Sequence, residues 1–315
     1  MTGGTGTAVE AQHLLDARQF TREWIENDLF PRARQLQQTP LNEVAQTLVG
    51  KRLFYLFYEA STRTRVSFET AVTLLGGKVA GMESHELIPE DERLEDRIQV
   101  INQYGYDFLL LRYHQEGGAR RAAGVSRVPV INAGDGAGQH PTQALLDAYT
   151  LWRELDRVDG LSIALVGDLS YERTTTSLAY LLARFRGIKL YLVSPHLLRI
   201  REGLRTYLEE SGTAFEEARD LRSVASEVDA IYVTRAHSDR LDHARRFDDG
   251  ASHYTVDAGV MEQLRPQAIV LHPLPRGQEL PAELDADPRI ACFRQAQNGL
   301  YVRMALLSLL AGGQT

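Results

Sequence analysis

Residues 51–77 read KRLFYLFYEASTRTRVSFETAVTLLGG and contain a strand pattern, a polar loop and a helix pattern in turn. The apolar and aromatic run at 51–58 predicts a buried strand. The helical pattern at 65–75 stops at Gly76 and Gly77, and glycine commonly ends a helix. Between them, residues 61–65 carry three hydroxyl side chains and two guanidinium groups. A strand leading into a helix is the unit from which α/β folds are built, and here the polar residues lie at its junction.

The rest of the chain repeats this strand-and-helix pattern. Further strands are predicted at 78–82, 107–113, 127–134, 161–168, 189–195, 213–218, 229–236 and 267–275. Helices are predicted at 94–104, 117–124, 140–155 and 293–311. Near-continuous apolar strands that alternate with helices indicate parallel sheets covered on both faces. We therefore predict an α/β protein with two doubly wound domains.

The domain boundary is expected where the polar run RELDRVDG at 153–160 interrupts the pattern. This gives domains at 1–152 and 153–315, with interdomain helices near 140–155 and 293–311. The second of these helices is expected to pack back on the first domain.

Composition excludes several classes of protein. The chain has 315 residues, of which 43% are hydrophobic, and its net charge of −7 argues against a general nucleic-acid binder. Cys292 is its one cysteine, so no internal disulfide and no cysteine-based zinc site is expected. The start, MTGGTGTAVEAQ, lacks the pattern of a signal peptide, and no apolar run approaches the roughly 20 residues of a membrane span. We expect a cytoplasmic protein.

Polar groups recur where the predicted strands end, which is the edge at which open α/β sheets bind ligands. The helix after the first strand offers unpaired N–H groups and the positive end of its dipole. Ser61, Thr62, Arg63 and Thr64 at this position are expected to form a phosphate cradle. The alternative is an ordinary helix cap with solvated arginines. The GxxxxGK[ST] phosphate loop is absent, and LVGD at 165–168 lacks the GxGxxG of a dinucleotide site.

Other polar residues follow the remaining strands. His140 begins a helix behind a glycine-rich turn, where a neutral imidazole that donates to a carbonyl oxygen is chemically reasonable. A capping histidine is the alternative. Arg173 and Arg235 follow strands of the second domain and have the geometry to bind carboxylates, although each alone is also typical of a surface arginine. Together these groups predict a di-anionic substrate.

These motifs resemble the aspartate/ornithine carbamoyltransferase family. The matching stretches, in order along residues 12–311, are FYEASTRTRVSFE, VINAGD running into QHPTQALLD, LVGDLSYERT, YVTR, LHPLPR and QAQNGL. The acceptor side resembles the aspartate branch, because Arg173 and Arg235 match and HPLPR stands where the ornithine branch has a cysteine motif.

The resemblance implies a carbamoyl-phosphate-binding first domain, an aspartate-binding second domain and carbamoyl transfer to L-aspartate in pyrimidine biosynthesis. It implies that Ser61, Thr62, Arg63 and Thr64 bind the phosphate and that Thr64, Arg112 and His140 polarise the carbamoyl oxygen. Gln143 and the carbonyls of Pro273 and Leu274 would accept from the carbamoyl NH₂, with a cis peptide at Leu274–Pro275. Arg173, Arg235 and His237 would contact the acceptor.

The resemblance further implies a homotrimer with shared active sites and leaves open a regulatory or dihydroorotase partner. It implies no metal or organic cofactor, because the acyl phosphate is already activated.

Two segments depart from the family pattern. The loop that in the family carries S-x-x-x-K-G-E is replaced by an acidic segment at 83–96 without lysine, in which His85 and Arg93 are the candidate substitutes. The family's T-R-x-Q-x-E-R reads TRAHSDR at 234–240. Three hypotheses follow: an aspartate carbamoyltransferase with a rebuilt loop, a related transferase that uses another amine or acyl phosphate, and a non-catalytic binding or assembly paralogue.

Overall fold

The structure, a computed structural model, describes residues 13–83, 92–235 and 251–312. The chain forms two compact units, one made of residues 1–142 with 299–315 and the other of residues 143–298. Helices α7 (Pro141–Leu155) and α12 (Cys292–Gly312) each contain a boundary between the units. The sequence-based boundary between residues 152 and 153 stays a prediction.

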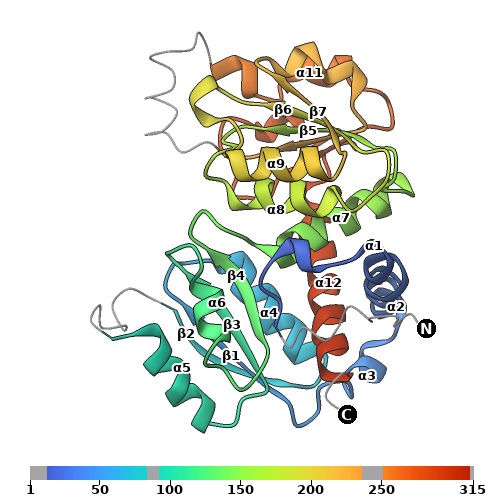
Figure 1. Cartoon of the computed structure of the whole chain (residues 1–315). Coiled ribbons are helices and arrows are strands. Elements are labelled where there is room, and N and C mark those ends of the chain that lie inside the picture. Colours follow the sequence, from blue (N-terminus) through green and yellow to red (C-terminus); the bar gives the residue numbers. More distant parts are fainter. Residues whose placement is uncertain (1–12, 84–91, 236–250, 313–315) are drawn as a thin grey trace, which may run out of the picture. The chain divides into compact units, whose positions relative to one another are not determined.

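The first unit is built on a four-stranded sheet in the order β2-β1-β3-β4 (Figure 1). All of its pairings are parallel. Its strands are β1 (Arg52–Phe57), β2 (Lys78–Glu83), β3 (Phe108–Tyr113) and β4 (Val130–Asp135). Its helices are α1 (Arg22–Trp24), α2 (Phe30–Gln38), α3 (Leu41–Val44), α4 (Thr62–Leu74), α5 (Leu94–Gln103) and α6 (Gly118–Ala123), with a π-helical turn at Ile25–Leu29.

Helices cover both faces of this sheet. On one face α5 and α6 pack over β1 and β3, burying Leu56, Leu109 and Leu111 with Ile98 and Ala122. Figure 1 shows α4 and the final turns of α12 on the other side of the sheet. These two helices are joined by a hydrogen bond from Arg303 Nη1 to Ser67 Oγ at 2.5 Å. Strands β3 and β4 are therefore almost entirely buried, as their apolar sequences predict, while the edge strand β2 stays partly exposed.

The second unit has a five-stranded parallel sheet in the order β7-β6-β5-β8-β9. Its strands are β5 (Ser162–Val166), β6 (Lys189–Val193), β7 (Ala214–Ala218), β8 (Ala230–Val233) and β9 (Ile269–Leu271). Its helices are α8 (Arg173–Leu182), α9 (Glu202–Glu210) and α11 (Ala258–Gln263), with short 3₁₀ turns at His196–Leu198, Leu221–Ser223, Ala225–Glu227, Ala251–Tyr254 and Ala282–Leu284. Figure 1 shows α8 and α9 on one side of this sheet and α11 on the other.

The predicted α/β class and all nine predicted strands are confirmed, with strand ends shifted by a few residues. One helix start was wrong: α4 begins at Thr62, not at residue 65. Ser61 occupies the extended cap position, and the next three polar residues already have helical backbone. Thr62, Arg63 and Thr64 thus form the first turn of α4, where backbone N–H groups have no helical acceptor. Within the described residues, no helix combines the length and apolar character needed to cross a bilayer.

Candidate active site

In the first unit, the candidate phosphate cradle is the first turn of α4. Thr62 and Arg63 are exposed, Ser61 is half-buried and Thr64 is buried. The side chain of Ser61 makes no capping hydrogen bond to the helix, so its hydroxyl is not used by the usual N-cap contact. Exposed donors at a helix N-terminus suit an anion. The turn can therefore present hydroxyls, a guanidinium and backbone N–H groups to a phosphate.

An acidic side chain, the first of the acidic segment at 83–96, lies at this turn in a contact that sequence reasoning did not predict. Glu83, the last residue of β2, accepts a hydrogen bond from the backbone N–H of Ser61 at 2.8 Å. Its other oxygen lies 2.8 Å from Nε of Arg65. Residues 84–91, which include His85, lie outside the described residues. Arg93 is exposed at the residue before α5.

Arg112 is held at the end of β3 by its two neighbours in the sheet. Its Nη1 donates to the carbonyl oxygen of Ala133 in β4 at 3.3 Å. Its Nε lies 3.4 Å from a carboxylate oxygen of Glu59, in the loop after β1. Because β1, β3 and β4 are adjacent and parallel, these contacts join the carboxyl ends of β3 and β4 to the loop after β1. Glu59 was quoted within the FYEAS motif, but its spacing alone did not mark it as a partner of Arg112.

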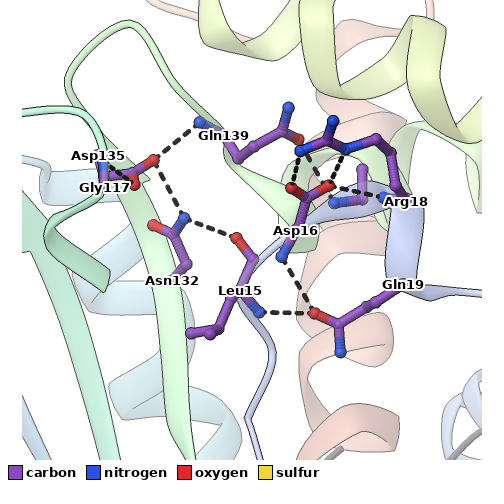
Figure 2. Close-up of polar contacts among 9 residues, drawn as sticks. Leu15, Asp16, Arg18, Gln19, Gly117, Asn132, Asp135 and Gln139 are labelled. Atoms are coloured by element: carbon purple, nitrogen blue, oxygen red, sulfur yellow. Dashed lines mark hydrogen bonds and ion pairs between the residues drawn. The ribbon is translucent and has the colours of Figure 1, made fainter. Parts of the chain in front are cut away.

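His140 is buried directly before α7, at the end of a tightly fastened loop. Figure 2 shows Asp135 at the base of this loop. Its Oδ1 accepts from the backbone N–H of Gln139 at 2.8 Å and from Asn132 Nδ2 at 3.2 Å, and its Oδ2 accepts from the N–H of Gly117 at 3.0 Å. Burial raises the pKa of Asp135, and these hydrogen bonds oppose that rise. The side chain thus fixes the backbone that carries His140.

The N-terminal segment at 13–19 supports the same loop from outside. Leu14 pairs with Ile131 beside β4. Asn132 also donates from Nδ2 to the carbonyl of Leu15 at 3.0 Å, and Gln139 Oε1 accepts from the N–H of Ala17 at 3.4 Å (Figure 2). Sequence reasoning assigned no role to this segment. Its importance arises from contacts with residues more than a hundred positions away, which no local pattern signals.

In the second unit, Gln143 belongs to a buried hydrogen-bond network. Its Nε2 donates to Asp147, one helical turn later in α7, at 2.9 Å. Asp147 also accepts from Tyr232 Oη at 2.8 Å and from Gln295 Nε2 at 2.6 Å. The acid in QALLD, four residues after Gln143 on an apolar helix, was the sequence signal that could have found it.

The segment after β9 carries the predicted carbonyl acceptors. The Leu274–Pro275 peptide is cis, as the resemblance implied, and Leu274 has φ of 56°. The N–H of Leu274 donates to Nδ1 of His272 at 2.7 Å, and Nε2 of His272 lies 3.0 Å from Glu279 Oε1. The turn that presents the carbonyls of Pro273 and Leu274 is therefore held by a buried histidine.

The two candidate acceptor arginines follow neighbouring strands. Arg173 is the first residue of α8, after β5, and Arg235 is exposed two residues after β8. The loops approach closely because Gly167, with φ of 120°, leaves no side chain against the carbonyl of Thr234. His237 lies outside the described residues. Within the described part of the chain, no cluster of His, Cys, Asp and Glu side chains is arranged to hold a metal ion.

Comparison with known proteins matches both units. Residues 12–153 match the model for the aspartate/ornithine carbamoyltransferase carbamoyl-phosphate-binding domain, and residues 159–310 match the Asp/Orn-binding domain. The chain belongs to the aspartate/ornithine carbamoyltransferase family. All of the candidate site residues that the structure describes lie within these two matched ranges.

Named relatives lie on the aspartate side of this family. The chain is 43% identical to the chloroplastic aspartate carbamoyltransferase of Arabidopsis thaliana, over 96% of this chain and 79% of the relative. It is 42% identical to the aspartate carbamoyltransferase catalytic subunit of Methanothrix thermoacetophila, over 96% of this chain and 99% of the relative.

Solved structures of aspartate transcarbamoylases are also similar to this chain. Aspartate transcarbamoylase from Trypanosoma cruzi, crystallised with carbamoyl phosphate and aspartate, has a TM-score of 0.85 at 36% identity and covers 94% of each chain. The catalytic subunit of M. jannaschii aspartate transcarbamoylase has a TM-score of 0.87 at 39% identity, over 96% of this chain and 98% of the other.

Proposed function

We propose that this chain transfers the carbamoyl group of carbamoyl phosphate to the amine of L-aspartate, giving N-carbamoyl-L-aspartate and phosphate. The observation that carries the proposal is the chain-long likeness to the T. cruzi enzyme crystallised with both substrates. The named relatives are aspartate carbamoyltransferases, which favours aspartate over another amine and favours catalysis over a binding role.

In this proposal, the first turn of α4 binds the phosphate. Ser61, Thr62 and Thr64 donate through hydroxyl and backbone groups, and Arg63 supplies a cation. When the amine attacks the carbonyl carbon, Thr64, Arg112 and His140 stabilise the negative charge that grows on the carbonyl oxygen. The C–O bond to phosphate then breaks, and phosphate leaves with the bonding electron pair and takes up the proton that the amine loses. The helix terminus stabilises the charge gained by the leaving group.

The remaining groups orient the two substrates. Gln143 Oε1 and the carbonyls of Pro273 and Leu274 accept from the carbamoyl NH₂, and Arg173 and Arg235 bind the acceptor carboxylates, with His237 beside them. Positioning of reactants that are already activated supplies most of the rate without a metal or organic cofactor. The fixed Arg112 and the fastened loop before His140 support this role because their donors need no reorganisation.

We also propose a homotrimer with shared active sites that works in pyrimidine biosynthesis. The designation of the Methanothrix thermoacetophila relative as a catalytic subunit supports a search for a regulatory or dihydroorotase partner. We propose a cytoplasmic location, although the Arabidopsis relative is chloroplastic.

The test is steady-state formation of N-carbamoyl-L-aspartate by the purified chain, beside Arg63→Ala and Arg235→Ala. The proposal is supported if the wild type turns over and both variants lose activity. Arg63→Ala should lose it through weaker binding of carbamoyl phosphate, and Arg235→Ala through a raised KM for aspartate. Carbamoyl phosphate binding without turnover of aspartate would contradict the acceptor, and absence of both would contradict the enzyme.

A further inference from the structure

The buried network around Asp147 has a chemical consequence for the substrate. Asp147 is fully buried, and three donors reach its carboxylate, from Gln143, Tyr232 and Gln295. A buried carboxylate needs such donors, because leaving it unpaired is costly. Burial raises the pKa of Tyr232 well above its usual value, so its hydroxyl keeps its proton and donates.

The carboxylate fixes which way Gln143 faces. An ionised carboxylate only accepts hydrogen bonds, so the amide of Gln143 must turn its NH₂ group toward Asp147. Its other end, the acceptor Oε1, is then available to a ligand. Gln143 is only 9% exposed and lies on the same helix as Asp147, which restricts the other orientations that its side chain could adopt.

The same carboxylate fixes Gln295 and, through it, the segment after β9. Nε2 of Gln295 donates to Asp147, so its Oε1 faces the other way and accepts from the backbone N–H of His272 at 2.9 Å. Nδ1 of His272 in turn accepts from Leu274. Because Nδ1 accepts, the ring proton resides on Nε2 and is directed at Glu279. The N–H of Leu274 is thereby used within the protein.

We infer that Asp147 is a positioning residue that makes this side of the site accept hydrogen bonds only, and so selects carbamoyl phosphate over acetyl phosphate. The inference rests on the proposed function, in which Gln143 and the Pro273 and Leu274 carbonyls meet the carbamoyl NH₂. Acetyl phosphate carries a methyl group at that position and offers no hydrogens to donate. A site built from hydrogen-bond acceptors rejects such an analogue, because the acceptors of the site are then left unpaired.

The experiment compares dissociation constants for carbamoyl phosphate and acetyl phosphate, measured by titration calorimetry on the purified full chain. In Asp147→Asn, the new NH₂ group allows the amide of Gln143 to reverse. We expect the preference for carbamoyl phosphate to fall about tenfold, almost entirely through weaker carbamoyl phosphate binding. The acetyl phosphate constant should change little. A purely structural effect would weaken both ligands alike, and that result overturns the inference.

Glu154→Gln is the matched control. It also removes a carboxylate of α7, but Glu154 pairs with Arg294 of α12 and lies outside the Asp147 network. It should keep the preference. If thermal unfolding shows that Asp147→Asn does not fold, the same measurements are made on Gln295→Met. An unchanged preference for carbamoyl phosphate in that variant overturns the inference.

Gln143→Ala separates the two levels of the argument. Loss of preference in Gln143→Ala with retention in Asp147→Asn overturns the role of Asp147 alone and leaves the proposed function intact. Retention in both overturns the inference together with the placing of Gln143 at the carbamoyl group.

Discussion

The carboxylate of Glu83 accepts a hydrogen bond from the backbone N–H of Ser61 at 2.8 Å, so an acid of β2 lies at the first turn of α4. Its second oxygen pairs with Arg65. The acidic segment at 83–96 thus begins with a negative charge beside the candidate phosphate cradle. The contact fastens Ser61, but it also lowers the positive potential that a phosphate would meet.

We predict that Glu83→Gln tightens the binding of inorganic phosphate by about two- to fivefold at low salt, with less effect at high salt. The amide oxygen still accepts from Ser61, while the charge is gone and Arg65 is released. Calorimetric titration with phosphate measures this. Glu69→Gln, which also faces Arg65 at 4.0 Å, is the control. Weaker binding in Glu83→Gln would mean that its charge holds the turn in place rather than opposing the ligand.

Arg112 should depend on Glu59 for its orientation. We predict that Glu59→Gln lowers kcat about three- to tenfold and leaves the KM for aspartate nearly unchanged, because a loosened guanidinium stabilises the carbonyl oxygen less well. Steady-state kinetics with both substrates measures this. Glu95→Gln breaks a comparable pair with Arg121 on the α5–α6 face and should leave kcat unchanged. An unchanged kcat in Glu59→Gln would show that Ala133 alone positions Arg112.

Much of this architecture was predictable because strands and helices leave local patterns. The nine predicted strand segments became nine strands, Arg112 lies near the end of β3, and Arg173 and Arg235 follow β5 and β8. The helices between residues 22 and 44 were missed, because the helical run at 22–38 contains Pro31 and a π-helical turn, and α3 has only four residues. The spacing of Gln143 and Asp147 could have indicated one contact of the Asp147 network, but the partners Tyr232 and Gln295 lie 85 and 148 residues away. A local pattern cannot report such contacts.

Gly167 should be essential for the acceptor side of the site. A methyl group there would lie 2.7 Å from the carbonyl oxygen of Thr234, and its φ of 120° is unfavourable for alanine. We predict that Gly167→Ala destabilises the fold by about 1–3 kcal/mol. It should also raise the KM for aspartate more than that for carbamoyl phosphate.

Urea unfolding and kinetics measure the two effects. Gly203→Ala, in open space in α9, is the control and should be neutral or slightly stabilising. Equal increases in the KM values of aspartate and carbamoyl phosphate in Gly167→Ala would contradict a local effect on the loops after β5 and β8.

Glu279 should give the turn after β9 a stability that depends on pH. Its carboxylate accepts from His272 Nε2 at 3.0 Å and from the N–H of Gly277 at 2.6 Å. Burial acts to raise the pKa of Glu279, but these hydrogen bonds bring it below the ordinary value of 4.5. A carboxyl with a lowered pKa in the folded state stabilises the protein above the unfolded-state pKa, and this stabilisation is lost as the pH falls through the folded-state pKa.

We therefore predict that wild type exceeds Glu279→Gln in unfolding free energy by about 1–2 kcal/mol at pH 7. The difference should shrink as the pH falls below about 4.5, the ordinary glutamate value, because protonation removes the charge from the wild type as well. Urea unfolding of both proteins across this range measures the difference. Glu283→Gln, an exposed change on the same segment, corrects for any general effect of losing one negative charge. A difference that grows on acidification would mean that Glu279 is held protonated, and His272 would then lack the acceptor that fixes the turn at Leu274.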